Sequence, residues 1–231
     1  MTENEWEGET IDPVWEKKYS EGHAEKYPWD IVVSFVFRNA PNDRARRDVH
    51  ILEVGFGAGN NLWFAAREGF SVAGIEGSPS AVDYARARFE REQLEGDLRL
   101  GDFTELPFED ESFDLVIDRG SLVCVGKKAH RKAISEIHRV LRRGGKFLYN
   151  GYADSHSSYR AGERGADDVT INIKGGTLAG VGQLHFVSRS EIDELFASDW
   201  ELRQIQRREW SEMLKAVSDI HAEWVVIAEK R

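Results

Sequence analysis

Three glycines in one short segment are the first residues of this chain whose spacing points to a particular chemistry. Gly55, Gly57 and Gly59 follow an apolar stretch in "HILEVGFGAGNN", residues 50 to 61. Glycine has no Cβ, so a glycine loop lets the backbone approach a ligand closely and turn its N–H groups toward it. A tight turn without a ligand would use the same residue type, so the flanking residues must decide between the two interpretations.

Two acidic residues beside the loop indicate a nucleoside ligand. Glu53 precedes the glycines, and Glu76 ends the next apolar segment, "SVAGIE". An acid at the end of a second strand accepts hydrogen bonds from the ribose hydroxyls of a nucleotide bound across the strand ends. The dinucleotide fingerprint G-x-G-x-x-G would need glycine where this chain has Asn60. The pattern therefore favours a nucleoside without a pyrophosphate, with a nicotinamide oxidoreductase as an alternative.

The elements that position these residues alternate along the chain. Apolar segments and segments with helical spacing follow one another, and Ser78 and Pro79 mark a helix start as N-cap and first-turn proline. This rhythm predicts an α/β fold with a doubly wound, mostly parallel seven-stranded sheet and an antiparallel C-terminal strand pair. The predicted strands are 49–54, 71–76, 97–102, 113–118, 146–152, 200–210 and 222–230; the predicted helices of this region are 60–70, 78–93 and 127–145, the last ended by glycines.

The chain is predicted to form a single domain, residues 1–231. A helical N-terminal cap occupies 1–45, with helices starting at Pro13 and Pro28, and the cofactor-binding core occupies 46–153. Residues 154–187 contain six glycines (162, 165, 175, 176, 180 and 182) and predict a lid or substrate insertion with a hairpin around Gly175-Gly176. Residues 188–231 supply a C-terminal helix and the strand pair.

Composition limits the classes of partner. The net charge of −10 disfavours a general affinity for nucleic acid, whose phosphates require Lys and Arg. Cys124 is the single cysteine, which excludes an intrachain disulfide and suits a reducing compartment. No apolar stretch is long enough to span a bilayer, and "MTENEWEGET" lacks the features of a signal peptide. We expect a cytoplasmic protein with no membrane contact.

Four segments in order, "LEVGFGAGNN", "GIEGSPSAV", "GDFTELPFEDESFDLVID" and "LRRGGKFLY", resemble the motifs of class I S-adenosylmethionine-dependent methyltransferases of the small-molecule type. The resemblance implies the Rossmann-like methyltransferase fold and S-adenosylmethionine as cofactor, with S-adenosylhomocysteine as product. It places the amino-acid part of the cofactor near Glu53 and over Gly55, Gly57 and Gly59, the ribose at Glu76, and the adenosine beside Gly77 and Ser78.

The same resemblance assigns the remaining cofactor residues. Asp102 is expected at the adenine amino group with Phe103 against the ring, and Asp118, Arg119 and Gly120 at the methionine end. Tyr19, Tyr27 and Trp29 are expected to cover the cofactor or substrate, with core packing as an alternative for Trp29. Phe56, Asn60, Asn61 and Thr104 complete the predicted set. Phe56 departs from the Cys or Ser that is frequent in the family.

The expected reaction is methyl transfer to an oxygen or nitrogen of a small metabolite or sugar-like acceptor. An oxygen of high pKa needs a base, whereas an amine only has to arrive neutral. His156 and His185 are the predicted bases because histidine titrates near neutrality, although each could equally be a structural histidine. Asp118 is a third candidate, and its following Arg-Gly-Ser, unlike the Pro-Pro-Tyr pattern of DNA-base enzymes, disfavours DNA.

Other readings stay open. Cys124 lies near the expected substrate or is a small buried hydrophobic residue. No convincing metal site is found in the sequence. A catalytically silent subunit that binds the cofactor and serves a partner is an alternative to an enzyme, and the protein is expected to be a monomer or homodimer.

Overall fold

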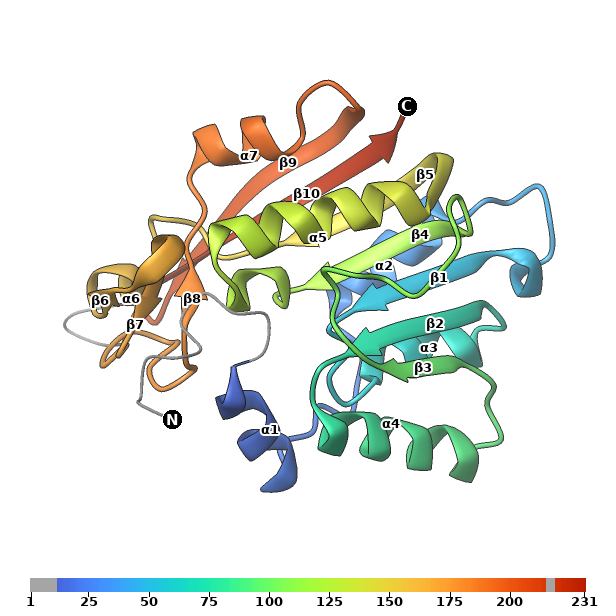
Figure 1. The fold of residues 1–231 in the computed structure, drawn as a ribbon, viewed down its shortest axis with the longest axis horizontal. Coiled ribbons are helices and arrows are strands. Elements are labelled where there is room, and N and C mark those ends of the chain that lie inside the picture. The colour runs from blue at the N-terminus through green and yellow to red at the C-terminus, as the bar shows by residue number, and fades with distance from the viewer. Residues whose placement is uncertain (1–11, 215–218) are drawn as a thin grey trace.

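A seven-stranded sheet organises the molecule in the computed structural model, which describes residues 12–214 and 219–231 (Figure 1). The strand order is β3-β2-β1-β4-β5-β10-β9, and the mostly parallel seven-stranded sheet with an antiparallel C-terminal pair confirms the predicted Rossmann-like methyltransferase fold. Strands β1 to β5 are parallel, and β10 runs antiparallel to both β5 and β9. The strands are β1 (His50–Val54), β2 (Ser71–Glu76), β3 (Asp97–Leu100), β4 (Phe113–Arg119), β5 (Leu141–Asn150), β9 (Trp200–Ser211) and β10 (Ile220–Lys230).

Helices cover both faces of this sheet. The helices are α1 (Pro13–Ser20), α2 (Asp30–Asn39), α3 (Asn60–Arg67), α4 (Pro79–Arg91), α5 (Lys127–Val140), α6 (Ser157–Arg160) and α7 (Arg189–Leu195), with short 3-10 turns at Arg46–Asp48, Leu122–Cys124 and Ala166–Asp168. Side chains of α2, α3 and α4 pack on one face around Ile51 and Leu148. Side chains of α5 and α7 pack on the other around Leu52 and Phe147. Each fully buried Leu, Ile or Phe stabilises this packing by roughly 1.5–3 kcal/mol.

Helix starts follow the capping residues, with one correction. Asp12 Oδ1 accepts from the N–H of Val14 at 2.9 Å, and Ser78 Oγ accepts from the N–H of Ala81 at 3.2 Å, so α1 and α4 begin where predicted. Helix α2 begins at Asp30, not at Pro28, because Trp29 stays extended as N-cap. The N–H of Trp29 donates instead to Asn61 Oδ1 at 3.0 Å, which anchors the chain to α3.

The glycines after α5 do not end that helix, as the sequence had suggested. Helix α5 ends at Val140, and Leu141 is already extended and paired with Phe113 of β4. The register shifts between Phe113 and Leu115, whose partner is Lys146, so the intervening residues bulge out of the ladder. Gly144, with φ of 73°, supplies the left-handed backbone that this bulge requires.

The insertion folds into a small sheet of its own. Strands β6 (Glu163–Arg164), β7 (Val169–Ile171) and β8 (Leu184–His185) pair in that order. The strands on either side of Gly175-Gly176, β7 and β8, do pair antiparallel as in the predicted hairpin, but the glycines lie within a long connection, residues 172–183, instead of a tight turn. There Ser158 Oγ donates to the carbonyl of Gly175 at 3.0 Å, and a Cβ at Gly176 would collide with the same hydroxyl. These glycines permit close packing on α6.

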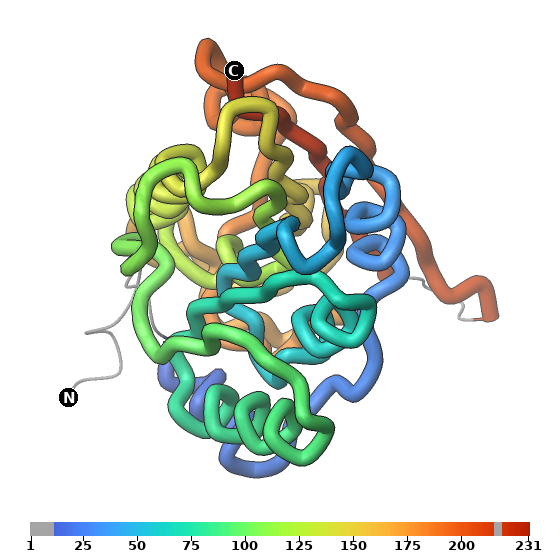
Figure 2. The backbone as a smooth tube through the Cα atoms, turned by 90° about the vertical axis from the view of Figure 1, so that its right-hand side faces the viewer, coloured from blue at the N-terminus to red at the C-terminus, as the bar shows by residue number. Residues whose placement is uncertain are grey.

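The end of the β9–β10 pair projects beyond the body of the molecule (Figure 2). In the described ranges, no helix combines the length and apolar character required to cross a membrane. The amino-terminal segment on which the expectation about a signal peptide rests lies outside the described residues. The division into cap, core, insertion and C-terminal part remains a prediction.

Candidate active site

The glycine loop between β1 and α3 has a backbone that only glycine adopts easily. Gly55, Gly57 and Gly59 have φ of 63°, 53° and 73°, all in the left-handed region. The N–H of Gly55 donates to the carbonyl of Ile75 at 2.8 Å, so the loop turns across the ends of β1 and β2. Ligands of open α/β sheets bind at these carboxyl ends.

Glu76 holds the loop to the end of β2. Its Oε2 accepts from the N–H of Gly57 at 2.8 Å, and its Oε1 accepts from the N–H of Ser78 at 2.9 Å. Burial raises the pKa of this carboxyl, while the backbone donors act in the opposite direction. The carboxylate is thus oriented between the loop and the start of α4.

Glu53 is a buried carboxyl, and only one of its two oxygens is hydrogen-bonded within the described structure. Its Oε1 accepts from Asn61 Nδ2 at 2.7 Å, but Oε2 has no hydrogen-bond partner in the described structure. Burial is the main reason that the pKa of Glu53 is raised to about 8. An orphaned buried carboxylate oxygen needs a donor, and the ammonium of an amino-acid ligand would supply one. Glu53 therefore fits the methionine part of S-adenosylmethionine.

Asp118, at the end of β4, has a structural role in this conformation. Its Oδ1 accepts from the N–H groups of Ser121 and Leu122 at 2.8 and 3.1 Å, which fixes the turn after β4. Burial is the main cause of the rise in its pKa to about 7. Asp118 is fully buried and is not among the residues that line the cavities at this edge of the sheet.

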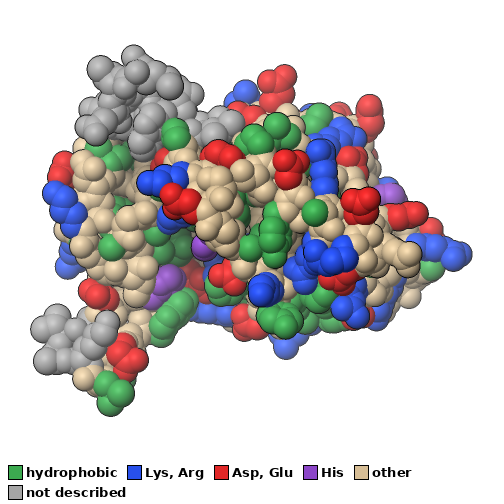
Figure 3. All heavy atoms as spheres, turned by 90° about the horizontal axis from the view of Figure 1, so that it is seen from below, with side chains coloured by type: hydrophobic (Ala, Val, Ile, Leu, Met, Phe, Trp, Pro, Cys, Tyr) green, Lys and Arg blue, Asp and Glu red, His purple; other side chains and the backbone are tan. Residues whose placement is uncertain are grey.

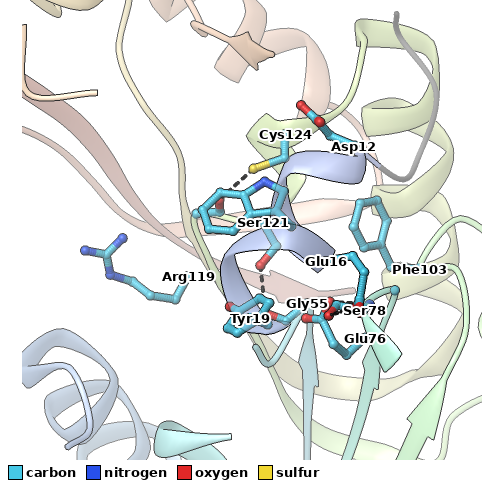
Figure 4. A pocket seen from close by; sticks show the side chains of 13 residues that line it. Asp12, Glu16, Tyr19, Gly55, Glu76, Ser78, Phe103, Arg119, Ser121 and Cys124 are labelled. Carbon is cyan, nitrogen blue, oxygen red and sulfur yellow. Dashed lines mark hydrogen bonds between the residues drawn. The ribbon is translucent and has the colours of Figure 1, made fainter. Parts of the chain in front are cut away.

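A cavity of about 140 Å³ lies between the glycine loop, α1 and the turn after β4 (Figure 4). Glu76 and Ser78 lie at one end with Phe103 nearby, while Arg119 extends away from them past Tyr19. The remaining lining residues are Asp12, Trp15, Glu16, Gly55, Gly77, Gly120, Ser121 and Cys124. An acid at one end and an aromatic ring beside it suit a ribose and an adenine.

Helix α1 covers this cavity. Glu16 accepts from the hydroxyls of Ser78 and Ser80, both at 2.5 Å, and from the N–H of Ser80 at 3.2 Å. These hydrogen bonds dock α1 on the start of α4. The hydroxyl of Tyr19 lies so close to Gly57 that a Cβ there would collide with it. Helix α1 thus lies over the glycine loop.

A second cavity, of about 460 Å³, adjoins the first. The two share Trp15, Tyr19, Gly55, Arg119, Gly120 and Cys124. The second extends to Glu53, Trp29, Tyr152, Trp210 and His221, so aromatic side chains from the cap, the sheet and the projecting strand pair surround it. In the view from below, histidine and hydrophobic side chains gather near the base of that projection (Figure 3).

The structure brings most of the predicted cofactor residues together around these cavities. Lining one or both are Tyr19, Trp29, Glu53, Gly55, Phe56, Gly57, Asn60, Asn61, Glu76, Gly77, Ser78, Phe103, Arg119 and Gly120. Tyr27 is 76% exposed and contributes its carbonyl, which accepts from Asn60 Nδ2 at 2.8 Å. Asp102, Thr104 and Gly59 line neither cavity; Asp102 Oδ1 accepts from the N–H of Thr104 at 2.7 Å.

The two predicted bases lie in different places. His185 lines a separate cavity, where its Nε2 lies 2.9 Å from Glu191 Oε1 and its Nδ1 lies 3.1 Å from the carbonyl of Asp168. His156 is buried behind the second cavity as the N-cap of α6. Burial is the main cause of its lowered pKa, about 4.

His221, which the sequence did not single out, lines the second cavity itself. Its ring stacks on Trp210, with centroids 4.2 Å apart and planes 21° apart. A signal for it exists in the strand pattern. Because β10 is antiparallel, its first residues lie at the edge where the parallel strands end, and His221 is the second residue of β10. Among residues 12–214 and 219–231, no group of three or more His, Cys, Asp or Glu side chains is placed to hold a metal.

A parallel sheet with a glycine loop at its carboxyl edge is typical of enzymes that bind nucleosides, and comparison with known proteins narrows the class further. Residues 51–145 match a family described as methyltransferase domain. A probable S-adenosylmethionine-dependent methyltransferase of Mycolicibacterium smegmatis is 34% identical over 127 residues, 55% of this chain and 46% of that protein. The sarcosine/dimethylglycine N-methyltransferase of Aphanothece halophytica is 31% identical over 102 residues, 43% of this chain and 36% of that protein.

A solved S-adenosylmethionine-dependent methyltransferase of Methanosarcina mazei has the same fold, with a TM-score of 0.67 at 20% identity, covering 88% of this chain and 98% of that one. Residues 51–145 therefore match a methyltransferase domain, and the chain has the fold of an S-adenosylmethionine-dependent methyltransferase. Its matches span about half of the length of the first curated relatives.

Proposed function

We propose that this protein transfers a methyl group from S-adenosylmethionine to an oxygen or nitrogen of a small molecule. The observation that carries the proposal is the pair of adjoining cavities, one beside Glu76 and the glycine loop and the other lined by aromatic side chains. Bound S-adenosylmethionine supplies a methyl group already activated on a sulfonium. The protein then has to hold cofactor and acceptor together and exclude water.

The proposed cofactor residues divide by chemistry. Glu76 takes the ribose hydroxyls, Glu53 takes the ammonium through its free Oε2, and Phe103 packs against the adenine. Glu53 and Glu76 place two buried acids along a cofactor that carries positive charge on both its sulfonium and its ammonium. Tyr19 and Trp15 of α1 close the site from above.

The second cavity is proposed as the acceptor site. Its volume of about 460 Å³ suits a small molecule. A relative that matches this chain is named for sarcosine and dimethylglycine, which are small molecules. An amine acceptor would need no base, whereas an oxygen acceptor of high pKa would need one; the histidines that line the cavity are His23 and His221.

The first test is thermal unfolding with saturating S-adenosylhomocysteine, S-adenosylmethionine or NADH. At 100 times its Kd a ligand adds roughly 2.7 kcal/mol of stability, which should raise Tm by several degrees. A rise with both adenosyl compounds and none with NADH is expected. A rise with NADH alone would refute the proposal in favour of an oxidoreductase.

Transfer itself is tested with methyl-labelled S-adenosylmethionine and fractionated cell extract. We expect label in a low-molecular-weight product, formed by the wild-type protein and lost in Glu53→Gln. Cofactor binding without any labelled product would instead identify a silent cofactor-binding subunit.

A further inference from the structure

A directed chain of hydrogen bonds ends at His221. The N–H of Ser158 donates to His156 Nδ1 at 3.0 Å, so a neutral His156 carries its proton on Nε2. That Nε2 lies 3.2 Å from Thr177 Oγ1 and donates to it. The hydroxyl of Thr177 therefore donates its hydrogen bond to His221 Nδ1, 2.7 Å away. A fixed backbone N–H thus sets the direction of the whole chain.

The consequence is a fixed tautomer of His221. With Nδ1 accepting from Thr177, the proton of the neutral ring lies on Nε2. The hydrogen bond found for this ring among residues 12–214 and 219–231 is the one at Nδ1, and the ring lines the second cavity. Burial, with the nearby charge of Arg119 as a second cause, lowers the pKa of His221 to about 4, so the ring is neutral near pH 7. His221 offers the cavity a donor.

Arg119 adds a cationic donor to the same cavity. Its guanidinium lies over the ring of Trp29, 4.0 Å from the centroid, and its buried Nε has no hydrogen-bond partner in the described part of the chain. None of the ion pairs found among the described residues includes it. The stacking on Trp29 holds the group in place, so it presents a pre-oriented fork for an anion.

We propose that Arg119 and His221 bind a carboxylate carried by the methyl acceptor, and that the acceptor is an aromatic acid. Arg119 supplies the charge, His221 supplies a second N–H, and Trp29 and Trp210 supply apolar ring surfaces in the same cavity. The inference rests on the proposed function, because it names the substrate of that site. Glu53, at the cofactor end of this cavity, would repel the same group and so orients the acceptor.

The tautomer can be measured without any ligand. Imidazole 15N–1H correlation spectra of the wild-type protein should show His221 with its proton on Nε2 and Nδ1 as acceptor. In Thr177→Val that preference should weaken, while Thr177→Ser should keep it. A proton on Nδ1 in the wild-type protein would overturn the proposed donor.

The substrate class is tested with benzoate and its neutral analogue benzamide, titrated into protein saturated with S-adenosylhomocysteine and followed by tryptophan fluorescence. We expect benzoate to bind at least tenfold more tightly than benzamide. Arg119→Gln and His221→Phe should each reduce that preference to threefold or less. Arg203→Gln, an exposed arginine of β9 paired with Glu229, is the control and should retain the preference.

The outcomes separate this inference from the proposed function. Equal affinities, or no benzoate binding by the loaded wild-type protein, would overturn the carboxylate site while leaving the methyltransferase intact. A tenfold loss of S-adenosylhomocysteine affinity in Arg119→Gln, with the benzoate preference kept, would assign Arg119 to the carboxylate of the cofactor and also overturn it. Failure of the wild-type protein to bind S-adenosylhomocysteine would instead refute the proposed function.

Discussion

Glu53 shows how a residue that binds the cofactor can lower the stability of the unliganded protein. Its side chain is 2% exposed and its Oε2 lacks a partner, so the ionised form is poorly solvated until a cation arrives. In Glu53→Gln we expect Tm at pH 8.5 to stay level or rise, while the affinity for S-adenosylmethionine falls at least tenfold. Calorimetric titration and thermal unfolding measure the two effects. Unchanged affinity would remove Glu53 from the cofactor site.

The same carboxyl should make cofactor binding pH-dependent. The pKa of Glu53 in the unliganded protein is about 8, and only the deprotonated form attracts the ammonium. Affinity should therefore fall as pH decreases from 8.5 to 6, by up to about tenfold for each pH unit below that pKa. Titrations in buffers of different ionisation enthalpy should show proton release on binding near pH 7. An affinity that does not change with pH, with no proton exchange on binding, would contradict this prediction. In Glu53→Gln the pH dependence of the affinity should disappear.

At the scale of elements, we expect α1 to act as a lid, because none of its residues is buried. Glu16 connects its eight residues to Ser78 and Ser80, and short, partly exposed helices open most easily. In Glu16→Ala we expect S-adenosylhomocysteine to associate and dissociate several-fold faster, because α1 opens more often. Stopped-flow tryptophan fluorescence measures both rates. Lys17→Ala, on the exposed side of α1, is the control; equal rates in all three proteins would show that α1 does not limit entry.

The elements that the sequence predicted are those with local signals. Capping by Asp12 and Ser78 and the left-handed glycines of the loop act within a few residues, so their pattern is visible in the chain. The end of α5 depends on Leu141 pairing with β4, a long-range contact with no local marker. His221 was missed for the same reason, since its place in the cavity comes from the antiparallel course of β10 and its contact with Trp210.

For the molecule as a whole, buried ionisable groups act on stability in opposite directions. Glu53 and Asp118 have raised pKa values, about 8 and 7, so the folded state binds protons that the unfolded state has lost, and their contribution falls as pH rises through 4 to 8. His130, His156 and His221 have lowered pKa values, about 3, 4 and 4, so their contribution falls as pH decreases below about 6.5. Between pH 5 and 7 the two sets offset each other.

His130 is one source of the stability that is lost as pH falls. It is completely buried between Tyr149 and His185, and neither ring nitrogen has a hydrogen-bond partner in the described structure. Burial is the main cause of its pKa of about 3, against an ordinary value of 6.5, so the unfolded state takes up the proton first as pH falls. Its contribution is therefore complete above about pH 6.5 and is progressively lost toward pH 3.

We expect His130→Phe, which keeps a ring against Tyr149, to remove this loss. From pH 7 to 4.5 the wild-type protein should lose on the order of 2 to 3 kcal/mol more unfolding free energy than the variant, as measured by urea denaturation at each pH. Tyr149→Phe is the matched control, because it changes the same stack without changing a group that titrates in this range, so its curve should run parallel to that of the wild-type protein. Parallel curves for wild type and His130→Phe would mean that His130 can be protonated in the folded state, and that the acid sensitivity of the molecule arises at His156 and His221.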